Sequence, residues 1–456
     1  MDRLVERLDG ALRALGGEVE VATVESWGAL IREAMQGKAR TFHTVEHLEE
    51  IWQDAGPIET LAILFHDLVY VQVDRGVPET VRLMVASAAD ACGGRFTARG
   101  FDPAQDRPGA LTARVFGIEP GTVLAPTTGL NEYFSALVAA RLLATVRPDR
   151  DVARVVACIE ATIPFRPADE QGNSPLDRLA VRLARTNREL ALGLSDEQVA
   201  EAIEIAAEVS HRDLANFADP DPAGFLAHTW RLLPETHEEL RRSRPYTIRQ
   251  YRASLQQSER FLAGLDAERI FPAVRGRDRE PRLVERRERA ARNLDVGVRY
   301  LRCKLFAVGL LEALAEATGG DAEMGLFMGD RPSLERAAPR LEQHLPAISE
   351  ERRAAHDPVV RDLLLHGRAG ETPFDTRTSP LSAHLYLRLG EPAVLAGARR
   401  AGELFAGRLE PTAFLAAIDP ACVADVAEAA ARTAHSRERA LLDLAARFRT
   451  AGTPPR

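Results

Sequence analysis

The stretch of residues 40–70 constrains the fold of this chain more than any other. It holds three of the eleven histidines of the sequence, namely His43, His47 and His66. Residues 59–65 are apolar on nearly every side, which predicts a buried helix, and His66 and Asp67 directly follow it. Burying this His-Asp pair is costly unless both groups are bonded, and a divalent cation bonds both together. The stretch therefore predicts a metal site in a helical domain.

The first two histidines of this stretch are four residues apart. Thr41 is the expected cap of a helix that begins near Phe42. In such a helix His43 and His47 share one face, with their Cβ atoms roughly 5–6 Å apart. We therefore expect the two imidazoles to lie side by side.

The order of a histidine, a later His-Asp pair and a final aspartate resembles the signature of the HD superfamily of metal-dependent phosphohydrolases. The segment FHTVEHLEEIW, followed by LAILFHDLVY, is similar to the small bacterial branch of predicted HD phosphohydrolases. It also resembles the His-Asn-x-x-His stretch of cyclic-nucleotide phosphodiesterases, with Thr44 in place of the asparagine. The resemblance covers residues 20–275 and implies an HD-domain helical bundle. Together with the helical patterns of the rest of the chain, it predicts an all-α protein in which this bundle is followed by a second helical domain.

The resemblance also implies roles for individual side chains. His43 would be the acid that protonates the leaving oxygen. The implied metal ligands within the stretch are His47, His66 and Asp67. A fourth ligand has to come from a later helix, and Asp213 is the first candidate because it matches an Asp-Leu-Ala of the bacterial branch. Asp177, which is also followed by a leucine and an alanine, is the alternative.

Glu132 opens a predicted helix and has two interpretations. In the resembling branch, carboxylates from a similar stretch lie close to the metal-bound water. Glu132 would then orient or deprotonate that water. The structural alternative is that Asn131 caps the helix and Glu132 interacts favourably with its N-terminal dipole. Both interpretations stay open on the sequence alone.

Three further side chains are candidates for substrate binding. Thr162 matches an Ile-x-x-Thr segment of the resembling family and would lie near the site. His211 and Arg212 precede Asp213, and a guanidinium binds phosphate oxygens bidentately. The alternative for Arg212 is an exposed position on a helix surface.

The distribution of histidines favours one metal ion over two. Oxygenases and two-metal phosphodiesterases of the superfamily use extra histidines after the His-Asp pair. Residues 68–210 contain none. We therefore expect one divalent cation, and mixed nitrogen and oxygen ligands without thiolate fit Mn²⁺, Fe²⁺, Co²⁺, Ni²⁺ or Zn²⁺.

A chain of 456 residues is too long for one ordinary core, so two domains are expected. Residues 1–275 would form the HD-type domain. The arginine-rich run of residues 276–293 would be a charged linker or an exposed helix. Residues 294–456 would form a helical accessory domain or a homodimer interface. Residues 93–131 are rich in glycine and proline, which predicts a lid, an insertion or partial disorder.

Composition excludes several classes of protein. The net charge of −8 argues against a nucleic-acid-coating protein. The four cysteines are far apart and read as reduced thiols, not as a disulfide framework. The N-terminus lacks a secretory pattern and the chain lacks a membrane-spanning apolar run, so a soluble cytoplasmic protein is expected.

Two functions from different classes remain open. The first is an enzyme that hydrolyses a phosphate ester of a nucleotide or another small phosphorylated metabolite, with one divalent cation activating water. The second is a catalytically silent HD module that binds a nucleotide or second messenger and signals through the C-terminal helical domain. Retention of all four implied ligands favours the enzyme, because a binding module has no need of them.

Overall fold

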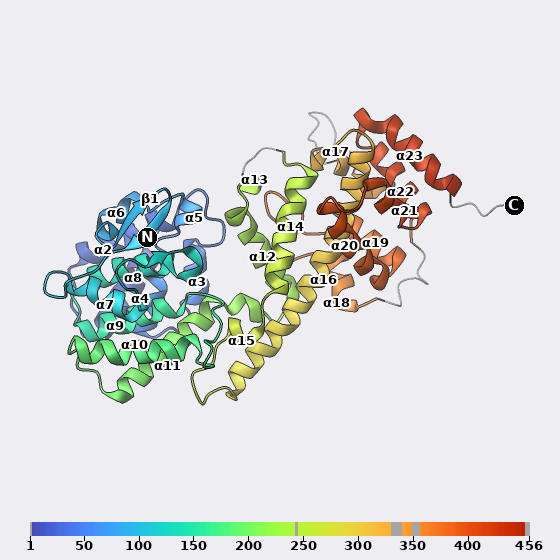
Figure 1. The fold of residues 1–456 in the computed structure, drawn as a ribbon. Coiled ribbons are helices and arrows are strands. Elements are labelled where there is room, and N and C mark those ends of the chain that lie inside the picture. Colours follow the sequence, from blue (N-terminus) through green and yellow to red (C-terminus); the bar gives the residue numbers. More distant parts are fainter. Residues whose placement is uncertain (1, 242–244, 330–339, 349–355, 452–456) are drawn as a thin grey trace. The chain divides into compact units, whose positions relative to one another are not determined.

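α-Helices dominate the fold. The computed structural model describes residues 2–241, 245–329, 340–348 and 356–451. The strands in these residues are short and form one small sheet in the order β1-β2-β3 (Figure 1). The all-α fold class predicted from the sequence is confirmed.

The chain divides into two compact units, each built from two separate segments. Unit 1 consists of Met1–Asp219 and Leu265–Ala291, and unit 2 consists of Pro220–Gly264 and Arg292–Arg456. This division differs from the sequence-based boundary, because residues 220–264 belong to unit 2. The run expected to be a charged linker or an exposed helix forms, from residue 281 on, the mostly exposed first part of α16 (Pro281–Ala317), a helix of 37 residues. The unit boundary falls within this helix.

Unit 1 is a bundle of helices with a small sheet. Its helices and strands are α1 (Asp2–Ala14), α2 (Val21–Met35), α3 (Val45–Ile51), α4 (Pro57–Phe65), α5 (Val71–Asp74), α6 (Glu79–Val85), β1 (Ala89–Cys92), β2 (Arg95–Ala98), α7 (Arg107–Phe116), β3 (Val123–Leu124), the 3₁₀ turn η1 (Pro126–Thr128), α8 (Leu130–Leu143), α9 (Asp149–Ala161), α10 (Pro175–Glu189), α11 (Asp196–Asp213), the 3₁₀ turn η2 (Ala215–Ala218) and α15 (Ala267–Ile270).

Helix α9 lies at the centre of unit 1. Helices α4, α7, α8, α10 and α11 all pack against it (Figure 1). Residues 152–161 are buried except Arg154, because apolar residues occupy nearly every face of this helix. Each fully buried large aliphatic side chain contributes about 1.5–3 kcal/mol to folding. This core fixes α4 and α11, whose C-terminal ends carry residues of the candidate site.

The glycine-rich and proline-rich residues 93–131 are folded. β1 and β2 form an antiparallel hairpin in which Cys92 pairs with Arg95. The two residues of its turn, Gly93 and Gly94, both have positive φ angles, as a tight hairpin turn requires. β3 pairs with β2, and α7 packs on α8 and α9. The glycines that suggested a lid or disorder therefore serve as turn and cap residues of compact structure.

The named secondary-structure elements of unit 2 are all helices or 3₁₀ turns in its described residues. Its elements are α12 (Pro222–Thr236), α13 (Glu238–Arg241), α14 (Ile248–Ala263), the greater part of α16, α17 (Met324–Met328), the 3₁₀ turn η3 (Leu341–His344), α18 (Pro358–His366), α19 (Pro380–Leu389), α20 (Glu391–Phe405), α21 (Pro411–Ala416), α22 (Pro420–Ala431), the 3₁₀ turn η5 (His435–Arg437) and α23 (Glu438–Ala451).

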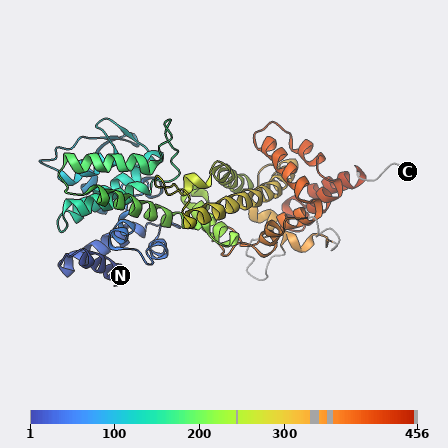
Figure 2. The same ribbon diagram turned by 90° about the horizontal axis from the view of Figure 1, so that it is seen from below.

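Helix α16 runs through unit 2 (Figure 2), and α12, α14 and α20 pack closely against it. A Cβ placed on Gly297 of α16 would lie 2.9 Å from Phe225 of α12 and 3.3 Å from Leu262 of α14. Farther along the helix, a Cβ on Gly309 would lie 2.9 Å from Ala401 of α20. These close approaches explain why residues 220–264 pack with unit 2.

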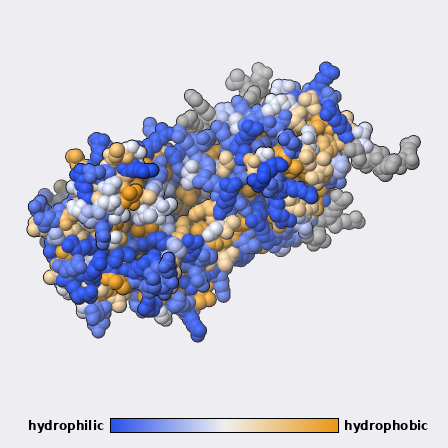
Figure 3. Space-filling view, in the orientation of Figure 1, coloured by the Kyte–Doolittle hydropathy of each residue, from blue (hydrophilic) through white to orange (hydrophobic). Residues whose placement is uncertain are grey.

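Hydrophilic residues cover much of the face drawn in Figure 3, with hydrophobic residues scattered among them. Large exposed apolar side chains do occur, such as Leu83 and Val181. Among the described residues, no helix has the length and apolar character needed to cross a membrane.

The close approach of Gly129 to Ile163 provides a test of the packing that positions α8. Gly129 has a φ of 88°, and a Cβ there would lie 2.3 Å from Ile163 Cδ1. A left-handed conformation costs a non-glycine residue roughly 1–2 kcal/mol, and overpacking adds roughly 1–3 kcal/mol. We expect Gly129→Ala to lower the free energy of unfolding by about 2–5 kcal/mol, measured by urea unfolding.

Gly121 is the matched control for this substitution. Its φ is 87°, but a Cβ would meet nothing within 4 Å. Gly121→Ala should therefore cost only the backbone part, about 1–2 kcal/mol. Equal losses for the two variants would contradict the packing described here.

Candidate metal centre

Four side chains from three separate segments of unit 1 converge on one point. His47 lies in α3, His66 and Asp67 directly follow the last residue of α4, and Asp213 is the last residue of α11. Each offers one nitrogen or oxygen atom, and these four atoms all lie within 4.8 Å of one another. The structure thus brings together the four side chains that the sequence suggested as ligands.

The Asp213 carboxylate joins the two histidines. Its Oδ1 lies 3.1 Å from His47 Nε2 and 3.3 Å from His66 Nε2. On the far side of the ring, His66 Nδ1 donates a hydrogen bond to the carbonyl of Ile63 at 2.8 Å. This bond turns Nε2 of His66 toward the cluster, as an outer hydrogen bond does for a metal-ligating histidine.

The charges in the cluster favour a cation. Burial alone would lower the pKa of His66, but Asp67 and Asp213 outweigh it and raise this pKa well above its usual value. For Asp213, burial favours the neutral acid, but hydrogen bonds from His47 and His66 lower its pKa to about 2. The pKa of Asp67 is likewise lowered, because the nearby imidazoles outweigh its burial. The cluster therefore holds two carboxylates that need positive charge close by.

Asp67 supplies a direct sign that a ligand fits here. Its Oδ2 lies 3.1 Å from His66 Nε2, yet it is buried and accepts no hydrogen bond from any residue that the structure describes. A buried carboxylate oxygen without a hydrogen bond is costly. A divalent cation bound by Nε2 of the two histidines and by the two carboxylates would satisfy it.

His43 lies beside the cluster, but not on the helix that the sequence suggested. Helix α3 begins at Val45 with Thr44 as its N-cap, so the expected cap at Thr41 is wrong. Residues 41–44 form a bend, in which the Phe42 ring is buried and packs on the His47 ring with centroids 4.8 Å apart. The His43 ring still lies 5.9 Å from the His47 ring, and it is half-buried.

Glu132 lies in the first turn of α8 and interacts with the cluster. The N-cap of α8 is Gly129, so Asn131 does not cap it; Asn131 Oδ1 instead accepts a hydrogen bond from the backbone of Val71. Burial, together with the charges of Asp67 and Asp213, raises the pKa of Glu132 to about 7. Its Oε2 is buried and has no hydrogen-bond partner among the described residues. This carboxyl group is therefore poised to gain or lose a proton near neutral pH.

Arg40 supports the segment that follows the His-Asp pair, a role that the sequence analysis missed. Its guanidinium donates to the carbonyl of Asp67 at 2.6 Å and to the carbonyl of Leu68 at 3.3 Å. It also forms an ion pair with Asp74 at 2.7 Å, and its side chain is fully buried. The sequence offered one signal for this role, namely an arginine close to the first histidine of the motif. An arginine that becomes buried there needs partners, because arginine is rarely buried unpaired.

The three predicted substrate-binding residues each have a hydrogen-bond partner within the protein. Thr162 Oγ1 donates to the carbonyl of Ile159 at the C-terminus of α9. His211 Nε2 bonds to the carbonyl of Pro272 at 2.9 Å, and burial lowers the pKa of this histidine to about 4. No contact recorded for the described residues joins these two side chains to the cluster.

Arg212 and Asp177 are held elsewhere in the same way. Arg212 donates to the carbonyl of Gln53 at 2.5 Å and pairs with Glu208 one turn earlier in α11. Asp177, the alternative fourth ligand, bonds to the N-cap residue Ser174 at the start of α10 and lies 3.4 Å from Arg275. The structure thus separates Asp177 from the candidate site and places Asp213 in it.

Comparisons of the chain with protein-family models, with curated proteins and with solved structures find no match. The site therefore has to be judged on its own geometry. Its two histidines and two aspartates are compatible with a metal centre of the HD type.

Removal of one carboxylate should abolish cation binding. We expect Asp213→Asn to weaken Mn²⁺ binding more than about a hundredfold, beyond the 10–100-fold typical of outer-shell groups. Asp177→Asn is the matched control, because this aspartate caps α10 away from the cluster. Isothermal titration calorimetry and metal analysis of the purified proteins measure the effect. Equal Mn²⁺ affinity of Asp213→Asn and the natural protein would contradict the site.

Cation binding should also release a proton. The raised pKa of His66 keeps this imidazole protonated at neutral pH, and a ligating Nε2 must be free of its proton. The apparent Mn²⁺ affinity is therefore expected to fall as the pH is lowered. Calorimetry at pH 7 in two buffers with different ionisation enthalpies measures the released proton, and identical heats in both buffers would contradict this account.

Proposed function

We propose that unit 1 is a metal-dependent phosphohydrolase that cleaves a phosphate ester of a nucleotide or another small phosphorylated metabolite. The observation that carries the proposal is the convergence of His47, His66, Asp67 and Asp213, whose ligand atoms lie within 4.8 Å of one another. Two imidazoles and two carboxylates without a thiolate suit Mn²⁺, Fe²⁺, Co²⁺, Ni²⁺ or Zn²⁺.

One divalent cation is the expected cofactor. The four side chains would hold it, leaving coordination positions for water and a phosphate oxygen. When bound, such a cation acidifies water and offsets the negative charge that develops on the phosphoryl group. The absence of histidine from residues 68–210 supports a single cation.

Glu132 and His43, which lie beside the cluster, would move protons at the two ends of the reaction. Glu132 Oε2 would take a proton from water as the water oxygen forms its bond to phosphorus. The bond between phosphorus and the ester oxygen then breaks, and the imidazolium of His43 would protonate that leaving oxygen. Burial raises the pKa of the Glu132 carboxylate, which suits it to act as a base near neutral pH.

The buried surroundings favour this chemistry. His47 and His66 are buried, and α9 and its neighbours close unit 1 behind them. Water excluded from such a site strengthens each electrostatic interaction in it. Arg40 holds the backbone of Asp67 in place, so the ligand positions are fixed before substrate arrives.

The direct test is a search for phosphate release. Purified protein loaded with Mn²⁺ should release phosphate from at least one member of a panel of nucleotides and sugar phosphates. His66→Ala and Asp67→Ala should lose both the cation and this activity. Tight binding of a nucleotide without any release would favour the second function, a catalytically silent module that signals through unit 2.

Variants of the proton-transfer residues should separate catalysis from metal binding. Glu132→Gln and His43→Asn are each expected to lower kcat by about 10²–10⁴-fold while the bound Mn²⁺ content stays unchanged. Asp177→Asn should leave kcat unchanged. An unchanged kcat in Glu132→Gln would remove this residue from the mechanism.

The pH profile gives a further readout for the same residue. Glu132 can accept a proton only when it is ionised, so kcat/KM should fall as the pH decreases through its pKa. The charge of a bound cation lowers this pKa below the value of about 7, so the acid limb should lie below pH 7. The Glu132→Gln variant should lack this limb.

A further inference from the structure

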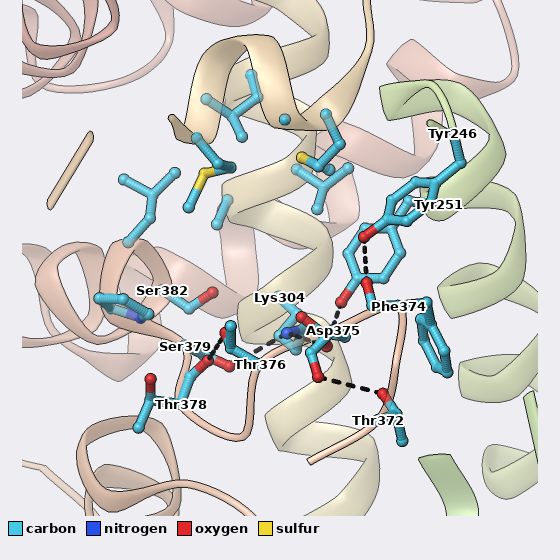
Figure 4. Close-up of a pocket in the computed structure, with 18 of the residues that line it drawn as sticks. Tyr246, Tyr251, Lys304, Thr372, Phe374, Asp375, Thr376, Thr378, Ser379 and Ser382 are labelled. Carbon is cyan, nitrogen blue, oxygen red and sulfur yellow. Dashed lines mark hydrogen bonds and ion pairs between the residues drawn. The ribbon is translucent and has the colours of Figure 1, made fainter. Parts of the chain in front are cut away.

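A second buried group of polar side chains lies in unit 2, next to a pocket. The pocket has a volume of about 610 Å³ and is lined by α14, α16, α17, residues 371–379 and the first turn of α19. Polar side chains gather along one wall, and aliphatic and sulfur-containing side chains lie along the opposite wall (Figure 4). This volume is in the range of small-molecule sites.

Lys304 is the most unusual residue of the polar wall. The chain has two lysines, Lys38 and Lys304, and uses arginine for every other basic position. The Lys304 side chain is buried, and its Nζ donates to Asp375 Oδ2 at 3.1 Å and to Ser379 Oγ at 3.2 Å. An ammonium group has three protons to donate, so these two bonds leave capacity for another acceptor.

The carboxylate of Asp375 is shared by two buried cations. Arg368 is fully buried and lies 3.4 Å from Asp375 Oδ2, the same oxygen that Lys304 contacts. The Trp230 indole and the Tyr251 hydroxyl also donate to this oxygen, each at 2.7 Å. Two positive charges therefore face one negative charge.

The pKa shifts of Asp375 and Tyr251 agree with two positive charges and one negative charge in this group. Burial alone would raise the pKa of Asp375, but Lys304 and Arg368 lower it below its usual value. Burial and the charge of Asp375 raise the pKa of Tyr251 well above its usual value, so the phenol stays neutral. The group consequently carries a surplus positive charge inside the unit, and buried charges are costly without a counter-charge.

The first turn of α19 adds further positive potential to the same wall. Ser379 is the N-cap of this ten-residue helix but makes no hydrogen bond from its side chain to the helix terminus. Its hydroxyl instead bonds to Tyr300 and accepts from Lys304. The backbone amides at a helix N-terminus lack partners within the helix and attract negative charge. Pro380, Leu381 and Ser382 of this turn line the pocket.

The remaining walls suit an apolar body. Val308 and Leu311 of α16 and Met324 and Met328 of α17 line the pocket. Methionine side chains adapt to ligands of irregular shape. The lining also includes Glu323 and the exposed Glu371, which oppose an anion, and Arg340, which forms an ion pair with Glu342 at 2.9 Å.

We propose that this pocket binds a small organic anion, with its carboxylate or phosphate group against Lys304 and the first turn of α19 and its apolar part against the methionine-containing wall. The anion supplies the counter-charge that the group of Lys304, Arg368 and Asp375 lacks. This ligand site is independent of the metal centre in unit 1. It gives unit 2 a binding function of its own.

The presence of only two lysines makes a direct test possible. Protein labelled with ¹³C at the lysine ε-carbon should give two ε-methylene signals, and Lys38→Arg assigns them because Lys38 is exposed. The probes are butanoate, octanoate and phenyl phosphate. At least one of them should move the Lys304 signal saturably and leave the Lys38 signal in place.

Uncharged and cationic analogues of the same length test the charge requirement. Octanol and octylamine should bind at least about tenfold more weakly than octanoate, because they lack the charged acceptor. No saturable shift of Lys304 with any of the three acids would overturn the proposal. Tighter binding of octylamine than of octanoate would overturn it too, because the glutamates would then dominate the pocket.

Two variants that fill the pocket locate the site. Met328→Trp and Val308→Phe should each abolish the shift of the Lys304 signal by the acid, and circular dichroism checks that each is folded. Full binding by a folded filling variant would place the ligand elsewhere and overturn the proposal. Asp213→Asn should bind the acid as the natural protein does, so failure of the metal centre leaves this inference standing.

Discussion

The candidate site of unit 1 depends on one carboxylate oxygen. Oδ1 of Asp213 lies within 3.3 Å of Nε2 of both His47 and His66, although these histidines are 166 and 147 residues away in sequence. The packing of α4 and α11 around the buried helix α9, and of α3 against α4, brings these atoms together. The cost of burying the two carboxylates and two imidazoles is repaid only by mutual hydrogen bonds or by a cation. The chemistry of the site therefore depends on the fold, because loss of packing around α9 would leave these charged groups without partners.

The local parts of this site could be predicted from the sequence, and the long-range parts only in part. The His66-Asp67 pair could be predicted as a buried site, because the apolar helix before it and the pair at its end lie within ten residues of sequence. The choice between Asp213 and Asp177 depends on which helix reaches the cluster. A local signal existed for Asp177, because Ser174 followed three residues later by an acid is the pattern of a helix cap.

Other differences have equally specific causes. The helix expected to begin near Phe42 begins at Val45 instead. The helical spacing of His43 and His47 gave no sign that Phe42 would be buried before the helix begins. The glycine-rich residues 93–131 were interpreted by composition, whereas Gly93-Gly94 between two short strands is a hairpin signal. Residues 220–264 were assigned to the N-terminal domain because the resemblance to the HD superfamily extends over them. They pack in unit 2 instead, where Phe225 and Leu262 lie close to Gly297 of α16. Contacts of this kind leave no periodic trace in a single sequence.

The division of the chain affects the order in which its two units can be completed during synthesis. The polypeptide leaves unit 1 after Asp219, returns at Leu265 and leaves again after Ala291. Neither unit is therefore one continuous stretch, and a ribosome completes unit 1 only after it has made the first segment of unit 2, Pro220–Gly264. A fragment ending at Asp219 would lack Pro272, whose carbonyl bonds His211 near the end of α11. Recombination at any single breakpoint would therefore divide at least one of the two units. An exchange that keeps both units whole has to transfer them together.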